Sequence, residues 1–271
     1  MWIFGDSYAQ DLNESHLRGR EFSSAGFLND TFNLSWVLDS WSYQLSSNFD
    51  MEIKNFGVCG SALEYSAQRY TENFSNFKDG DIVIFIVTQL ERKYLIDSRP
   101  SWGIPWQVQE FFKEAGYSQN DIDFYNRAYV EFDRRPNDTI LSLLLHSAAA
   151  LKNRNIKVLF IPCFMDGEVT MREYREKFPG SINETFGHLN SISRQEIIEK
   201  FRKEANTSGR DTRINHMHKL NHDVLINKLT DCIVNDAPLD LNNGFVTEVF
   251  DHIPTLETNG FLNRERNKAH E

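Results

Sequence analysis

Residues 82–87, with the sequence Ile-Val-Ile-Phe-Ile-Val, restrict the fold more than any other segment of this chain. The run contains no polar residue, and all of its members except Phe85 are β-branched. A strand with one face in water alternates apolar and polar residues, and this run does not alternate. It therefore predicts a strand with both faces buried, which is typical of a parallel sheet covered by helices.

Three other segments, with less uniformly apolar sequences, predict further strands at 2–5, 51–56 and 156–162. Between the strands, apolar residues recur at helical spacing and predict helices, at 34–47, 61–74, 136–153 and 220–234. Strands that alternate with helices form right-handed βαβ units, so we expect one parallel sheet with helices on both faces.

Three stretches depart from this alternation. Residues 93–135 are rich in aromatic residues and too long for a tight connection, so we interpret them as an inserted helical lid. Residues 164–210 are charged and weakly patterned, and a helix is expected only at 193–205. We predict one α/β domain over residues 1–235, with the lid inside it, followed by a C-terminal arm over 236–271.

The composition restricts the class of protein. Hydrophobic residues make up 40% of the chain and aromatic residues 13%, which is enough for a packed core. The formal net charge of −10 argues against a broad nucleic-acid surface, which needs clustered Lys and Arg, so we expect no nucleic-acid partner. No apolar stretch reaches the roughly 18 residues of a membrane helix, so we expect no membrane partner.

The cysteines and the first residues bear on the compartment. Cys59, Cys163 and Cys232 show neither metal-ligand spacing nor a disulfide framework, so we expect reduced thiols and a cytoplasmic location. Met1 leads directly into the first predicted strand without a basic and apolar leader, and we expect no signal peptide. Release by lysis or packaging into a particle is compatible with this pattern.

The serine of Gly5-Asp6-Ser7 is the first candidate for a catalytic residue. It follows the predicted strand 2–5 at its carboxyl end, where ligands and catalytic groups collect in parallel sheets. A serine in that position is a nucleophile when a histidine lies beside it. Gly-Asp-Ser is also common in ordinary loops, and we expect Asp6 to brace the turn rather than to react. The residues at the other strand ends therefore distinguish a catalytic serine from an ordinary loop serine.

Polar segments elsewhere in the chain match this serine block. They are Asn-Phe-Gly-Val-Cys-Gly-Ser at 55–61, Val-Thr-Gln-Leu-Glu-Arg at 87–92 and Asn-His-Met-His-Lys-Leu-Asn-His at 215–222. With Ser7 they resemble the blocks of the SGNH/GDSL hydrolase family, over roughly residues 1–90 and 136–235. The resemblance implies a flavodoxin-like three-layer α/β/α sandwich, an acyl-enzyme mechanism and no metal or organic cofactor.

Within this resemblance, three residues take the main catalytic roles. Ser7 matches the nucleophile, and His216 matches the general base that precedes the last helix. Gly60 matches the glycine of the oxyanion hole, since a residue without Cβ lets its backbone N–H approach closely. Asn221 and His222 stand where the family often has glycine followed by an aromatic residue or histidine.

The third block departs from the family pattern. Thr88 and Gln89 stand in place of the family's Gly-x-Asn-Asp, and either side chain can donate a hydrogen bond to an oxyanion. Arg92 is a candidate contact for an anionic group of the substrate, or else a structural ion pair. This block and the last block, Asn-His-x-x-x-x-Asn-His at 215–222, are similar to a subgroup from large tailed phages with Thr-Ser-x-x-Arg after the strand. The similarity implies a phage-encoded, virion-associated protein as an alternative location.

The acid that normally orients the base is also replaced. Arg213 occupies the position three residues before His216, where the family has aspartate. Asp211 or Asn215 can orient the imidazole instead, or Ser7 and His216 work as a dyad. Loss of the orienting acid lowers the rate by several orders of magnitude, so an inactive protein is also compatible with the sequence.

We therefore expect a serine esterase or acetylesterase that hydrolyses a small ester or an O-acetyl group on a glycan. One alternative is a non-catalytic protein of the same fold that serves as a virion or interaction protein. A second alternative is a metal-dependent phosphoesterase that uses Asp6, His216 and His218. The sequence pattern indicates neither the acyl group nor the oligomeric state.

Overall fold

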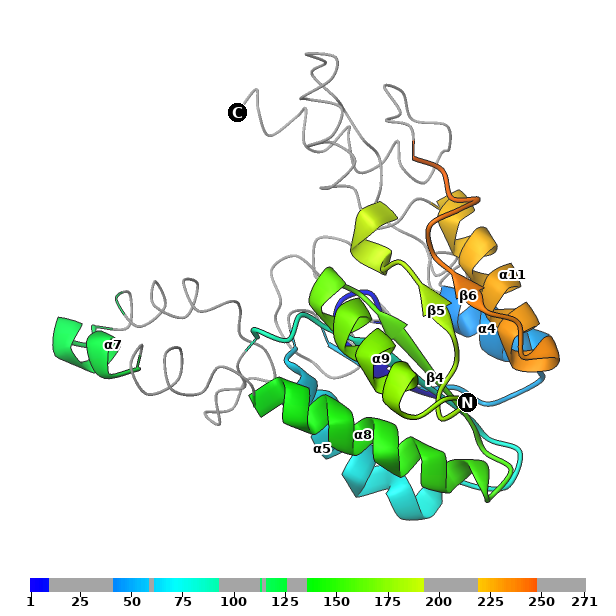
Figure 1. Ribbon diagram of the computed structural model, residues 1–271, viewed down its shortest axis with the longest axis horizontal. Helices are drawn as coiled ribbons and strands as arrows, with labels where there is room; N and C mark the ends of the chain where they lie inside the picture. Colours follow the sequence, from blue (N-terminus) through cyan, green and yellow to red (C-terminus); the bar gives the residue numbers. More distant parts are fainter. Residues whose placement is uncertain are drawn as a thin grey trace, which may run out of the picture.

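The computed structural model describes residues 1–9, 41–58, 61–92, 113, 116–125, 136–192 and 219–247. These residues form a central sheet with helices around it (Figure 1). The four strands are all parallel and lie in the order β2-β1-β3-β4. Their bounds are Trp2–Gly5 (β1), Lys54–Gly57 (β2), Ile82–Val87 (β3) and Lys157–Pro162 (β4). The predicted parallel sheet is therefore confirmed.

The two faces of the sheet carry different apolar side chains. Successive residues of a strand point to opposite faces, so the uninterrupted apolar run of β3 fills both layers of the core. One face contains Ile3, Ile84, Ile86 and Ile161, and the other contains Phe4, Phe85 and Phe160. On the aromatic face, rings of neighbouring strands stack, with centroids 5.3 Å apart for Phe4 and Phe85 and 4.9 Å apart for Phe85 and Phe160.

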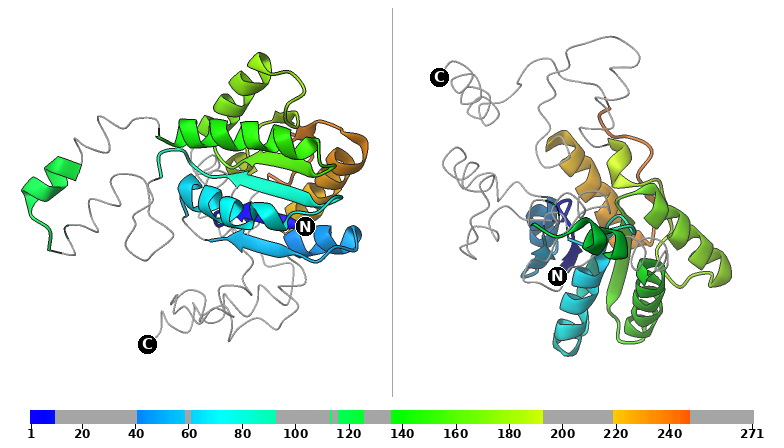
Figure 2. Two further views of the ribbon diagram at one scale, coloured as in Figure 1. Left: turned by 90° about the horizontal axis from the view of Figure 1, so that it is seen from below. Right: turned by 90° about the vertical axis from the view of Figure 1, so that its left-hand side faces the viewer.

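Helices cover both faces of the sheet (Figure 2). The isoleucine face is covered by α4 (Trp41–Asn48) and α11 (Lys219–Asn235). The aromatic face is covered by α5 (Leu63–Asn73), α8 (Pro136–Lys152) and α9 (Met165–Lys177). This order of layers confirms the α/β/α sandwich expected from the sequence.

The sequence pattern does not predict α9. Only a narrow stripe of this helix is buried, which leaves too few apolar residues for a helical period. Its charges nevertheless suit the helix dipole, with Asp166 and Glu168 in the first turn and Arg175 and Lys177 in the last. The helix expected at 193–205 lies outside the described residues.

The start of β2 also differs from the expectation, because β2 begins at Lys54 rather than at Met51. The Met51 N–H donates to the Ser46 carbonyl at 3.0 Å, so this residue closes the end of α4 instead of pairing with β1. Asp50, directly before it, has a φ of 50°, which turns the chain sharply between the two elements.

A second sheet of two parallel strands pairs β5 (Thr185–Phe186) with β6 (Leu239–Asp240). β6 belongs to the segment that we interpret as a C-terminal arm, and Leu239 is fully buried in the core of the isoleucine face. Within the predicted lid, the structure describes residues 113 and 116–125, which include α7 (Gln119–Tyr125). Two short 3₁₀ helices, at Phe74–Asn76 and Leu189–Ile192, complete the described elements.

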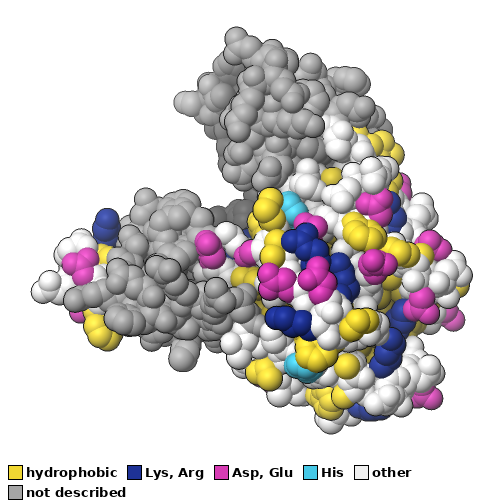
Figure 3. Space-filling view, in the orientation of Figure 1, with side chains coloured by type: hydrophobic (Ala, Val, Ile, Leu, Met, Phe, Trp, Pro, Cys, Tyr) yellow, Lys and Arg dark blue, Asp and Glu magenta, His cyan; other side chains and the backbone are white. Residues whose placement is uncertain are grey.

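None of the described helices is long and apolar enough to span a membrane. On the face of the molecule in Figure 3, acidic and basic side chains are interspersed over the described surface.

We predict that Phe85→Ala strongly destabilises the protein. The ring is 1% exposed and also contacts Tyr70 at 5.1 Å between centroids, so its removal leaves a cavity in the aromatic layer. The free energy of unfolding, measured by urea denaturation, should fall by about 3–5 kcal/mol. The control Phe124→Ala removes a ring that is 66% exposed and should change it by less than about 0.5 kcal/mol. Equal effects of the two substitutions would contradict the central position of Phe85.

Candidate active site

The residues after β1 form a tight turn around Ser7. The Asp6 carbonyl accepts a hydrogen bond from the Ala9 N–H at 3.0 Å, and the Asp6 carboxylate accepts one from the Tyr8 N–H at 3.1 Å. An aspartate that bonds its own backbone two residues on forms an Asx turn, for which this residue type is favoured. Ser7 lies within the turn closed by these two hydrogen bonds, at the carboxyl end of β1, and its exposed fraction is 5%.

The carboxylate of Asp6 contacts the ends of two other strands. It is fully buried, and its Oδ2 accepts hydrogen bonds from Thr88 Oγ1 at 2.8 Å and from Arg92 Nη1 at 2.9 Å. Cys163 Sγ lies 3.7 Å from its Oδ1. Thr88 directly follows β3 and Cys163 directly follows β4, so one side chain links the carboxyl ends of three strands. Asp6 therefore braces the turn, as expected from the sequence.

Gly5, the last residue of β1, has no room for a side chain. A Cβ there would lie 2.5 Å from Ile86 Cβ and 3.0 Å from Ala9 Cβ. The Gly5 carbonyl accepts hydrogen bonds from the Val58 N–H at 3.1 Å and from Ser61 Oγ at 2.9 Å. Glycine at this position thus permits the close approach of β3 and of the second polar block to the serine turn.

Asn55 also joins the second block to the serine turn. Its amide nitrogen donates to the Ala9 carbonyl at 2.7 Å, and its amide oxygen accepts a hydrogen bond from the Gly57 N–H at 2.8 Å. Asn55 is 3% exposed, so both ends of the amide are satisfied inside the protein, as burial requires. The asparagine that opens the second block is therefore a structural residue of the site.

Two contacts orient the third block. Arg92 reaches past Asp6, and its Nη1 lies 3.4 Å from the Ser61 carbonyl of the second block. The Leu90 N–H donates to Asp166 Oδ2 at 2.6 Å, and Asp166 lies in the first turn of α9. The helix that the sequence pattern does not predict thus holds the loop after β3 in place.

The end of β4 belongs to the same network. The Cys163 N–H donates to the Val87 carbonyl, and the Cys163 carbonyl accepts a hydrogen bond from the Asn190 N–H, both at 2.8 Å. The Asn190 side chain accepts a further hydrogen bond from the Tyr8 hydroxyl at 3.0 Å. The sequence pattern does not indicate Tyr8 or Asn190 as residues of the site. Tyr8 could have been found as the neighbour of Ser7, whereas nothing in the sequence distinguishes Asn190.

The buried thiols are not suited to nucleophilic chemistry. Burial raises the pKa of Cys163 well above its ordinary value, and the negative charge of Asp6 raises it further against the opposing effect of Arg92. Burial likewise raises the pKa of Cys232 to about 11. Since the thiolate is the reactive form, both side chains are inert, packed thiols at neutral pH.

The structure brings four of the predicted site residues to one edge of the sheet: Ser7, Thr88, Gln89 and Arg92. Arg92 forms an ion pair with Asp6, which is the structural alternative considered for it. The remaining candidates, Gly60, Asp211 and His216, lie outside the described residues, as do Cys59, Asn215 and His218. Their roles stay predictions.

Within the described part of the fourth block, Asn221 has a structural role. Asn221 lies in the first turn of α11, and its amide exchanges two hydrogen bonds with the Val246 backbone, at 3.1 and 2.7 Å. His222 is 9% exposed. Asn221 thus attaches the chain after β6 to the start of α11, directly after the segment that carries His216.

We predict that Arg92→Gln destabilises the protein through Asp6. It removes the cation from a carboxylate that is 0% exposed, and breaking a buried ion pair in this way costs about 3–5 kcal/mol. Asp6→Asn should lower the free energy of unfolding less in the Arg92→Gln variant than in the native protein. In a double-mutant cycle measured by urea unfolding, the coupling energy between the two residues should exceed about 1 kcal/mol.

A surface pair provides the control for this cycle. Arg69 and Glu72 form an ion pair with side chains 31% and 43% exposed, so Arg69→Gln should cost less than about 1 kcal/mol. Strictly additive effects of Arg92→Gln and Asp6→Asn would show that the two side chains do not stabilise each other.

This chain matches no protein-family model and no curated protein. A solved structure that aligns with it bears the description "putative lipolytic protein of G-D-S-L family" and comes from Desulfitobacterium hafniense DCB-2. The alignment covers 86% of this chain and 98% of that chain, with 12% sequence identity and a TM-score of 0.36. Similarity at this level assigns no activity.

Proposed function

We propose that this protein is a serine esterase with Ser7 as its nucleophile. The observation that carries the proposal is the braced turn at residues 6–9, which holds Ser7 at the carboxyl end of β1. Catalytic groups in parallel α/β sheets collect at this edge, and a nucleophile on a rigid support needs little reorganisation before it reacts. The resemblance of the Gly-Asp-Ser block to SGNH/GDSL hydrolases supports the same role.

In the proposed reaction, Ser7 Oγ attacks the carbonyl carbon of an ester while His216 takes the hydroxyl proton. The tetrahedral intermediate collapses to an acyl-enzyme, and the proton passes from His216 to the leaving alcohol. A water molecule then attacks the acyl group with His216 again as the base, which releases the acid and restores Ser7. Asp211 is our candidate for orienting the imidazole, with Asn215 or an unassisted dyad as alternatives.

We assign the oxyanion hole to the N–H groups of Ser7 and Gly60 and to the Gln89 side chain. Thr88, the other candidate in the third block, donates its hydroxyl hydrogen to Asp6. Gln89 is half-buried, and its amide makes no hydrogen bond to another described residue. A donor that is already bonded to an acceptor is less available to a developing oxyanion, which favours Gln89 over Thr88.

The substrate class that we propose is a small ester, including an O-acetyl group on a glycan. The glycan is favoured by the similarity of the third block to proteins of large tailed phages.

A non-catalytic protein of this fold is the second candidate, because Thr88 and Arg92 both support Asp6 and leave the third block with few donors for a substrate. The metal-dependent alternative is weaker, since both Asp6 oxygens already accept hydrogen bonds.

A fluorophosphonate probe tests the nucleophile. The native protein should label, and Ser7→Ala should lose the label because it removes the reacting oxygen. Ser47→Ala, an exposed position on α4, is the matched control and should label like the native protein. Circular dichroism verifies that each protein is folded. A folded native protein that does not label would refute the esterase and leave the non-catalytic candidate.

The base and its orienting residue are tested with p-nitrophenyl acetate. His216→Ala should lower kcat by about 10⁴-fold or more, and Asp211→Asn by up to about 10⁴-fold with little change in KM. His146→Ala is the control, since this histidine lies on α8 and bonds Tyr174, and should keep the native kcat. Native activity in Asp211→Asn together with a loss in Asn215→Ala would transfer the orienting role to Asn215.

A further inference from the structure

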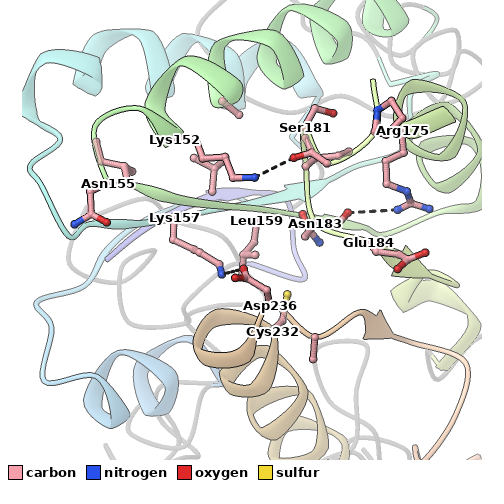
Figure 4. Close-up of a pocket in the computed structure, with 17 residues that line it drawn as sticks. Lys152, Asn155, Lys157, Leu159, Arg175, Ser181, Asn183, Glu184, Cys232 and Asp236 are labelled. Atoms are coloured by element: carbon pink, nitrogen blue, oxygen red, sulfur yellow. Dashed lines mark hydrogen bonds and ion pairs between the residues drawn. The ribbon is translucent and has the colours of Figure 1, made fainter. Parts of the chain in front are cut away.

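A cavity of about 650 Å³ lies beside the amino-terminal half of β4 (Figure 4). Because the strands are parallel, this is the end of the sheet opposite to Ser7. Its walls come from the end of α8, the start of β4, the loop 179–184 after α9 and the end of α11. Ligand pockets commonly have volumes of roughly 300–1,000 Å³. The cavity is therefore large enough to be a binding site separate from the candidate active site.

The wall formed by β4 presents an unpaired strand edge at Val158. The Lys157 N–H donates to the Asp81 carbonyl on the β3 side, so the peptide groups of the next residue face away from β3. By the same alternation, the peptide groups of Phe160 also face away from β3. The Phe160 N–H donates to the Asn183 amide oxygen at 2.8 Å, and the Phe160 carbonyl accepts a hydrogen bond from the Asn183 amide nitrogen at 3.0 Å. Val158 lines the cavity, and neither its N–H nor its carbonyl bonds another described residue. The Asn183 side chain shows how an amide group pairs with this edge.

Cations from α8 and α9 lie on one side of the cavity. Lys152 Nζ donates to the Gly180 carbonyl at 2.9 Å, and Arg175 Nη2 donates to the Thr185 carbonyl at 3.1 Å. The hydrogen bonds of both cations thus go to neutral carbonyls, while Glu184, which lines the same cavity, is a carboxylate near Arg175. Burial lowers the pKa of Arg175 from its ordinary value, against the opposing effect of the nearby Glu184. The guanidinium is charged at neutral pH, so an anionic group in the cavity would be attracted to it.

The side of the cavity at the end of α11 has a different character. Cys232 and Ala237 contribute small side chains, and the charge of Lys157 is already paired with Asp236. Figure 4 shows Lys152 above β4 and both Cys232 and Asp236 below it. The two sides of the strand edge thus favour acidic groups and small apolar groups, respectively.

We propose that this cavity binds an extended peptide segment in which acidic and small apolar residues alternate. The segment adds to the outer edge of β4, and its backbone pairs with the N–H and carbonyl of Val158, as in other cases of β-strand addition. Because side chains alternate along a strand, its acidic residues face Lys152 and Arg175 while its apolar residues face Cys232 and Ala237. The proposal does not depend on the esterase activity.

Two end-blocked pentapeptides, Glu-Val-Glu-Val-Glu and Lys-Val-Lys-Val-Lys, test the proposal on the full-length protein. Nuclear magnetic resonance follows the Val158 amide during each titration, and calorimetry gives the Kd. The acidic peptide should shift the Val158 resonance and bind at least about tenfold more tightly than the basic one, because of the cations on one wall. Methylation of the backbone nitrogens of the acidic peptide removes strand hydrogen bonds and should weaken binding by about tenfold or more.

Charge reversal tests the wall of the cavity. Lys152→Glu should weaken binding of the acidic peptide by about tenfold. Lys177→Glu makes the same change at an exposed position of α9 outside the lining and should leave the Kd within about twofold. Labelling of Ser7 should be the same in both variants and in the native protein, which separates this site from the esterase.

Three results would overturn the proposal. The first is that neither pentapeptide shifts the Val158 resonance at millimolar concentration. The second is that backbone methylation leaves the Kd unchanged, which would remove the strand-like pairing. The third is that free glutamate shifts the resonance as strongly as the acidic peptide, which would make the cavity a site for small anions.

Discussion

The buried carboxylate of Asp6 is the interaction on which the candidate site depends. A carboxylate without contact to water is strongly unfavourable unless it is paired, and here the partners are Thr88, Arg92 and the Cys163 thiol. Because two of these partners directly follow β3 and β4, satisfying one side chain brings the ends of three strands together. Ser7 takes its position from this arrangement, since it is the next residue after Asp6.

The layers of the core support this edge from both faces of the sheet. On the aromatic face, α9 packs through Met171 and Tyr174, and the Asp166 carboxylate at its first turn holds the loop after β3. On the other face, the indole of Trp41 in α4 donates to the Tyr8 carbonyl at 2.9 Å. Packing of the helices and orientation of the polar loops are therefore coupled, because the same helices that cover the sheet supply groups to its carboxyl end.

The outer edge of β4 has different neighbours at its two ends. Near the carboxyl end, the Asn183 amide pairs with Phe160 in the way that a neighbouring strand would. Toward the amino end, the peptide groups of Val158 face a cavity with Lys152 and Arg175 among its lining residues. Natural sheets usually cover or charge their edges. Here the Asn183 amide covers the edge at Phe160, and charged side chains of both signs surround it at Val158.

The buried strands, the parallel sheet, the helix layers and the place of Ser7 after β1 could be predicted, because they depend on local periodicity. α9 could not, since its narrow buried stripe gives too weak a period. By itself, the sequence determined which polar residues end each strand. Only the tertiary structure decided that Thr88 and Arg92 donate hydrogen bonds to Asp6, which lies 82 and 86 residues before them in the sequence. The physical reason is that hydrogen-bond partners are set by distance in space.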